Sequence, residues 1–290
     1  MRNRIWLLAG LLLVAVAVMA DEPAPQTETL MTMRVDGEIA IDKEGRVLAY
    51  TIATKLQPEI KAVLDKAIPG WVFFPVLIDG KPTAVKTKMR ITLGGKPVDN
   101  GYKVGIDNVV FRDESVKEEV GAVAPSGVKL SLKSRRPLPE YPRYSVNGHV
   151  LVYIRAAPNG DIEEAFAAQS SLFNAKGSEE ELAAALKAME VNAVKAIKRW
   201  KLNVDTQGKQ PTLADLTETI SVVYTMAGST VTKETAGIWR WENRAPYRDV
   251  PWLRDTRLAQ RIGVSDVDFG EMMPVASPVR LRDGVIGKAL

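Results

Sequence analysis

The chain has 290 residues, no cysteine and one histidine, and its 39 Lys and Arg against 35 Asp and Glu give a formal net charge of +4. The absence of cysteine excludes disulfides, thiol nucleophiles and thiolate metal sites, so the stability of the protein must come from packed cores. The near balance of charge gives no strong electrostatic argument for a nucleic-acid partner. The length fits two small domains and a tail.

Residues 1–20 have the features of a secretory signal peptide. Arg2 and Arg4 precede an apolar run over residues 5–19, and small residues lie at the expected cleavage position. The run is shorter than the roughly 20 residues that a spanning helix needs. We therefore expect cleavage and a periplasmic protein. The alternative is an uncleaved segment that anchors the chain in the inner membrane, which is the one membrane contact that the sequence suggests.

A strand, turn, strand, helix and strand follow one another over residues 30–95. Two alternating strands flank a turn at Gly45, where a glycine supplies the positive φ of a tight hairpin. Pro58 suits the first turn of an amphipathic helix, whose apolar stripe ends at Trp71. A Pro-Thr loop then leads to a last alternating strand over residues 86–93. This order predicts one small α+β module.

The same plan returns over residues 137–228 with longer elements. Two alternating strands flank a turn at Gly160, Ser178 and Glu181 form a capping box, and the helical stripe ends at Trp200. In both segments a Pro-Thr pair begins eleven positions after the Trp. The repeat predicts an α+β fold of two modules, each a roughly three-stranded antiparallel sheet with one packed helix.

The rest of the chain has weaker patterns. Residues 96–136 are predicted to be a connector that holds two short strands, near 104–111 and 128–132. Residues 229–290 have no sustained period and are predicted to be an irregular tail, rich in Trp and Arg, that wraps the modules and buries its aromatic side chains. A docking surface for a partner or for peptidoglycan is the second interpretation of this tail. Interleaved aromatic and basic residues can bind single-stranded nucleic acid, but an exported protein rarely meets it, so no nucleic-acid partner is expected.

The second segment carries an ordered set of small motifs. A Pro-Leu-Pro-Glu-Tyr-Pro run over residues 137–142 precedes it, a glycine begins the first strand, an Asn-Gly turn follows, and Ser170 and Ser171 end the second strand before the helix that closes at Trp200. In order and spacing these motifs resemble the C-terminal domain of TonB-type energy transducers. The first segment is similar to a shortened, diverged relative that lacks the Tyr-Pro pair.

The resemblance implies a two-layer domain and a mode of recognition. Its last strand would pair with an extended segment of an outer-membrane transporter, by strand addition at the sheet edge. Independently of the family, a three-stranded sheet leaves unpaired edges, and such an edge can template another strand. The partner-binding residues implied in this chain are Tyr141, Pro142, Leu216, Thr219, Ser221, Val223 and Thr225.

Several features limit what the resemblance carries. A transducer has a polar anchor motif and a long Pro-rich spacer, and this chain has neither, so coupling to a proton motor is not expected. One alternative is a structural or dimerising envelope protein without a free edge. Another is an envelope hydrolase that uses Asp266 and Asp268. Because no catalytic motif is present, we expect no enzymatic activity, no cofactor and no metal site.

Single residues also admit more than one interpretation. Trp71 and Trp200 are predicted to close the two cores, and His149 is predicted to be partly exposed and structural. The Tyr141–Pro142 pair either contacts a partner or only stiffens the chain, and the sequence leaves this open. A solvated outer face is predicted for three alternating cations, Lys86, Lys88 and Arg90.

Overall fold

The computed structural model describes residues 27–78, 80–112, 128–206, 208, 210–227, 236–253, 260–282 and 284–288. The predicted signal peptide at 1–20 lies outside these residues. The α-helices in this part of the chain are α1 (Pro58–Ala67) and α2 (Glu179–Ile197), and neither is both long and apolar enough to cross a membrane. The strands are β1 (Glu28–Ile41), β2 (Val47–Ile52), β3 (Leu77–Ile78), β4 (Lys81–Pro82), β5 (Val85–Val98), β6 (Gly101–Arg112), β7 (Lys129–Ser134), β8 (Asn147–Ala156), β9 (Ile162–Phe173), β10 (Lys201–Asp205), β11 (Thr217–Tyr224), β12 (Arg240–Arg244) and β13 (Met272–Pro274).

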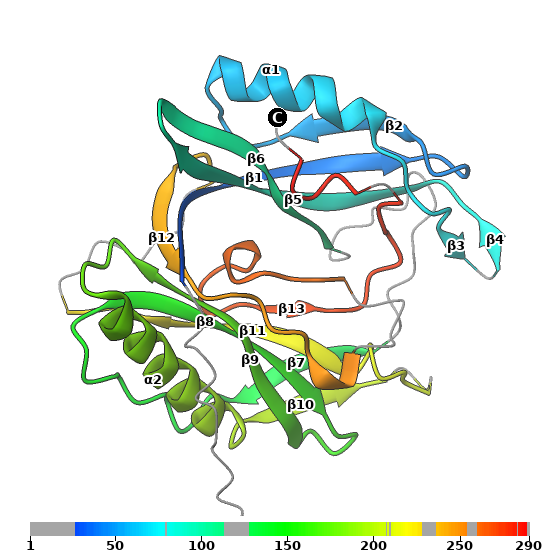
Figure 1. Cartoon of the computed structure of the whole chain (residues 1–290). Helices are drawn as coiled ribbons and strands as arrows, with labels where there is room; N and C mark the ends of the chain where they lie inside the picture. The colour runs from blue at the N-terminus through cyan, green and yellow to red at the C-terminus, as the bar shows by residue number, and fades with distance from the viewer. Residues whose placement is uncertain are drawn as a thin grey trace, which may run out of the picture.

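Most of the strands belong to one antiparallel sheet. Eight of them lie in the order β13-β11-β8-β9-β12-β1-β5-β6, and β2 pairs with β1 beside this path (Figure 1). The pairs β7–β10 and β3–β4 form two small sheets of their own. The α+β class predicted from the sequence is confirmed. The structure differs from the expected pair of separate three-stranded sheets, because strands of both segments share one sheet of nine strands.

The two repeated segments nevertheless make the same local bonds. Strands β5, β1 and β2 pair in the same relative order as β11, β8 and β9. In the first segment the Phe73 N–H donates to the carbonyl of Gly45 at 2.7 Å, and in the second the Leu202 N–H donates to that of Gly160 at 2.9 Å. Both glycines have φ of +86°. In each segment, therefore, the residue two positions after the Trp binds the hairpin turn.

Each helix covers its own core on one face of the sheet. The first core contains Trp71 and Leu64 of α1, and the second contains Trp200 and Met189 of α2. Both tryptophans are buried, which confirms their predicted core role. The capping box of Ser178 also forms as predicted, and α1 begins at Pro58.

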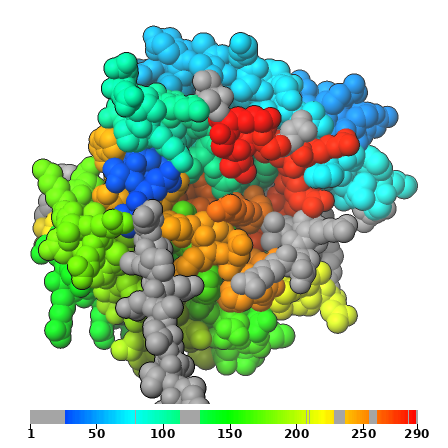
Figure 2. Space-filling model, in the orientation of Figure 1, coloured from blue at the N-terminus to red at the C-terminus, as the bar shows by residue number. Residues whose placement is uncertain are grey.

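The C-terminal tail contributes strands of the main sheet and is not irregular throughout. Strand β12 pairs with β1 on one side and with β9 on the other, so it joins the strands of the first segment to those of the second. In the view of Figure 2 the orange and red tail fills the surface between the blue and cyan first segment and the green second segment. Sequence patterns missed β12 because its inward side chains, Arg240, Glu242 and Arg244, are charged.

The stretch predicted to be a connector also adds to the sheet. Strand β6 pairs with β5 from Gly101 to Arg112, with a register shift opposite Thr92 and Leu93. It is longer than the short strand predicted near 104–111, because that shift interrupts the alternation of apolar residues. Strand β7 forms near the second predicted stretch and pairs with β10. Residues 113–127 of the predicted connector lie outside the described residues.

Candidate functional site

The edge of β11 was predicted to be open, and the structure closes most of it. On one side β11 pairs with β8, and on the other it pairs with tail strand β13 through Thr219 and its two neighbours. The ladder is extended by the Ser221 N–H, which donates to Glu271 O at 3.1 Å, and by the Val275 N–H, which donates to Thr217 O at 3.3 Å. The tail therefore covers this edge from residue 217 to residue 221.

The predicted partner-binding residues fall into two groups around this closure. Thr219 and Ser221 are buried, and the Thr219 hydroxyl donates to Met273 O at 3.1 Å. Leu216, Val223 and Thr225 are half-buried. Because backbone groups alternate in direction along a strand, Val223 is the next residue after Ser221 whose N–H and C=O point to the side of β13. Pairing with the tail ends before it.

The lead-in segment (137–142) runs along α2 and is held by side-chain bonds. The Trp200 indole N–H donates to Pro137 O at 2.7 Å, and the Asn192 amide donates to Glu140 O at 2.9 Å. Pro142 is buried, whereas Tyr141 is 42% exposed and its ring lies 6.0 Å from that of Tyr224 at an edge-to-face angle. The segment is thus fixed on the fold, and Tyr141 keeps an accessible face near the end of β11.

A second feature, which the sequence did not indicate, is a buried ionic cluster on the sheet face that the tail covers. We call it the polar seam, and it contains Arg34, Arg90, Asp266, Asp268, Arg240, Glu242 and Arg244.

The tail is bound to β1 and β5 through two arginines of the polar seam. Arg34 donates to Asp268 Oδ1 at 2.8 Å and to Val267 O at 2.9 Å. Arg90 donates to both oxygens of Asp268 at 2.9 and 3.0 Å and to Asp36 Oδ1 at 2.6 Å. Arg90 was predicted to lie on a solvated face with Lys86 and Lys88, but it is buried. Its charge is tolerated because N–H groups on two edges of the planar guanidinium each donate to a carboxylate, Asp36 or Asp268.

Glu242 lies at the centre of the polar seam. Its carboxylate accepts hydrogen bonds from Thr32 of β1 at 2.7 Å, Ser171 of β9 at 3.1 Å and Ser265 of the tail at 2.8 Å. Burial opposes ionisation of this carboxyl, but the adjacent Arg240 cation and the Thr32 hydroxyl outweigh it, and the pKa of Glu242 lies below its ordinary value. One charged group therefore joins both segments and the tail.

His149 lies beside the polar seam and is fully buried, so the prediction that it is partly exposed is wrong. Its ring lies 4.8 Å from that of Phe173 and 5.2 Å from that of Phe269. Within the described residues neither ring nitrogen has a hydrogen-bond partner. Burial, with the nearby Arg240 cation, holds the pKa of His149 well below its ordinary value, so the neutral form is the buried one.

The two aspartates of the hydrolase hypothesis are both engaged in structural contacts. Asp266 is fully buried and accepts hydrogen bonds from Thr92, Asn108 and the Gly263 N–H. Burial raises the pKa of Asp266, whereas for Asp268 burial is outweighed by Arg90 and the pKa is lowered. Both carboxyls hold the tail on the sheet, so this pair gives no support to acid–base catalysis.

The sequence did not predict the polar seam, and the reason is physical. Alternation of polar and apolar residues in β1, such as Arg34 between Met33 and Val35, normally marks a solvent-facing side. Here a third layer, the tail, covers that side. The one available signal was the acidic residues within the tail, Asp266 and Asp268 among them, which are opposite in charge to Arg34 and Arg90.

In comparisons with known proteins, no family model matches the chain, and neither a curated protein nor a solved structure shows significant similarity to it. Among the residues that the structure describes, no group of three or more His, Asp or Glu side chains is placed to hold a metal ion.

Proposed function

We propose that this chain is an exported, non-catalytic protein-binding component of the cell envelope, built from two TonB C-terminal-like units. The observation that carries the proposal is the repeated unit itself. Its strand order and its bond between the hairpin turn and the strand after the Trp occur in both segments. A link to TonB-dependent transport through segments of outer-membrane transporters is part of the proposal, and it rests on the motifs of residues 137–226.

The partner would add a strand where β11 extends past its tail partner. Val223 and Thr225 follow the last residue paired with the tail, and Tyr141 exposes its ring close by. An extended segment could pair with this short edge while the tail remains in place. Strand addition draws its affinity from main-chain hydrogen bonds, so this site favours an extended peptide over a folded surface.

Val223→Pro tests this edge. Proline removes the outward N–H that a partner strand would use, and leaves the β8-facing groups of Val222 and Tyr224 in place. We expect at least a tenfold loss of affinity for transporter-derived extended peptides, measured by calorimetric titration. Val223→Ala, which keeps the N–H, is the matched control and should bind within about threefold of the parent. Equal binding by both variants would refute the edge as the site.

A second candidate function is a structural envelope protein with no free edge. The pairing of β13 with β11 favours it, because the tail already occupies the position that a partner strand would take. Amide hydrogen exchange separates the two candidates. Protected Val223 and Thr225 amides in the free protein, together with a dimer by light scattering, would favour the structural role over partner addition.

A further inference from the structure

The near-neutral composition hides a strong separation of charge. Two stretches, residues 129–143 and 187–201, hold ten of the Lys and Arg residues but only two acidic ones, Glu140 and Glu190, which gives them a net charge of +8. The remaining residues hold 29 basic and 33 acidic side chains, a net charge of −4. The stretches are separated by 43 residues, 144–186, and only the fold can bring their charges together.

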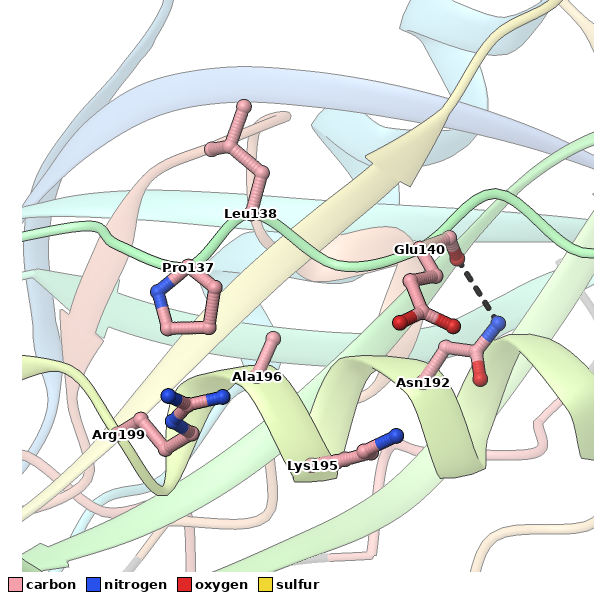
Figure 3. Close-up of a pocket in the computed structure, with 7 residues that line it drawn as sticks. All are labelled: Pro137, Leu138, Glu140, Asn192, Lys195, Ala196 and Arg199. Atoms are coloured by element: carbon pink, nitrogen blue, oxygen red, sulfur yellow. Dashed lines mark hydrogen bonds between the residues drawn. The ribbon is translucent and has the colours of Figure 1, made fainter.

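The fold places both stretches on one surface. The indole of Trp200 is bonded to Pro137, Asn192 to Glu140, and β10 pairs with β7 so that Lys201 lies opposite Ser134. The pocket between the lead-in segment and α2, about 60 Å³ in volume, is flanked by Lys195 and Arg199 (Figure 3). We define the basic face by its exposed cations, Lys133, Arg135, Arg136, Lys195, Lys198 and Arg199.

The charge of the basic face is not neutralised by its neighbours. No ion pair between described residues involves any of its six cations. Of the two acidic side chains in these stretches, Glu190 is buried and bound to Ser170 and Arg248, so it does not offset the surface charge. Glu140 is the one exposed carboxylate of the two stretches.

Two aliphatic side chains lie among these cations and face solvent. Leu138 is 62% exposed and points away from α2 in Figure 3, and Val191, one turn before Lys195, is 51% exposed. Lysine and arginine around aliphatic side chains suit the boundary between phospholipid headgroups and acyl chains. The cations are also long and flexible, and no described residue forms an ion pair with them, which suits a fluid layer of phosphates better than the ordered Arg forks that recognise a folded protein.

We propose that the basic face binds the surface of a bilayer that contains anionic phospholipids. The cations attract the headgroup phosphates, and Leu138 and Val191 enter the headgroup boundary. This contact uses other residues than the β11 edge does, so a protein could be held at a membrane surface while it binds a partner. It would act even if the N-terminal segment is removed.

Vesicle co-sedimentation of the full chain tests the proposal. The probes are phosphatidylcholine vesicles with and without phosphatidylglycerol, at low and high salt. We expect binding to anionic vesicles to exceed binding to neutral ones at least tenfold and to weaken as salt rises. The N-terminal segment carries Arg2 and Arg4 and also favours anionic vesicles, so its share is set by the comparison of variants below, all of which keep this segment.

A charge-matched pair of variants locates the contact. Lys195→Glu with Arg199→Glu should lower the affinity for anionic vesicles at least tenfold. The control, Lys66→Glu with Lys88→Glu, makes the same charge change at exposed positions elsewhere and should lower that affinity less than threefold. Equal losses in the two double variants would overturn the proposal, as would equal binding to neutral vesicles. Binding to soluble polyglutamate but not to anionic vesicles would also overturn it, in favour of an acidic macromolecule. Val223→Pro should leave vesicle binding unchanged, which keeps this test separate from that of the β11 edge.

Discussion

At the scale of single residues, His149 is the side chain whose environment predicts the clearest dependence of folding stability on pH. It is the one histidine of the chain and is buried against Phe173 and Phe269. Burial and the nearby Arg240 cation disfavour its protonation and outweigh the Glu242 carboxylate, which favours it. The folded pKa is lowered, so the unfolded chain binds more protons at mildly acidic pH. Stability contributed by neutral His149 is therefore complete above about pH 6.5 and is lost as the pH falls toward the folded pKa.

His149→Phe should remove this sensitivity. A pH change from 7.5 to 5.5 should lower the unfolding free energy of the parent by about 1 kcal/mol more than that of the variant. The variant should also be at least as stable at pH 7.5, because phenylalanine fits an aromatic site and carries no unpaired ring nitrogens. Urea unfolding at both values measures the difference. The pKa values of Asp266 and Glu271 are raised, so these carboxyls favour the folded state as pH falls, opposite to His149. Their contribution is the same in parent and variant and cancels in the comparison. A variant with the parent's pH dependence would contradict the assignment to His149.

At the scale of elements, the two hairpin turns have the same steric requirement for glycine. A Cβ on Gly45 would lie 2.1 Å from Phe73 O, and one on Gly160 would lie 2.1 Å from Leu202 O. Gly80 has a similar φ of +77°, but no atom of the described residues lies within 4 Å of the position that a Cβ would take there. Gly80→Ala should therefore cost about 1 kcal/mol of stability, from backbone strain alone.

Gly45→Ala and Gly160→Ala should each cost about 2–4 kcal/mol, because a backbone carbonyl must also move. Thermal or urea unfolding of the three variants measures this. A loss at one of the two turns no larger than that at Gly80 would show that the turns are not equivalent.

The local residue patterns of each element explain which helices and strands could be predicted from the sequence. The spacing of Pro58, Trp71, Ser178 and Trp200 predicted both helices and their buried faces, because each helix buries one apolar stripe. Strands β12 and β13 were missed because they are short and pair with residues more than fifty positions away, so no local period marks them. The candidate edge at β11 was identified, but its closure by β13 depends on those distant contacts.

At the scale of the whole molecule, the tail makes a single sheet out of two repeated segments. Strand β12 forms backbone hydrogen bonds with a strand of each segment. Within the polar seam, Arg34 and Arg90 of the first segment bond the tail, and Glu242 of the tail bonds both segments. Removing one partner from a buried ion pair typically costs about 3–5 kcal/mol, so the tail and the segments should unfold together. The basic face and the β11 edge are then two surfaces of one rigid body.

Site-resolved native-state hydrogen exchange tests this central claim most directly. We predict that the amides of β12, of Leu30 in β1 and of Leu172 in β9 exchange with the same opening free energy as Ile91 and Val152 in the two cores, since all are released by one cooperative unfolding event. Exchange of the β12 amides within seconds, while Ile91 and Val152 remain protected with two different free energies, would contradict it. That result would describe two independent units with a loosely attached tail.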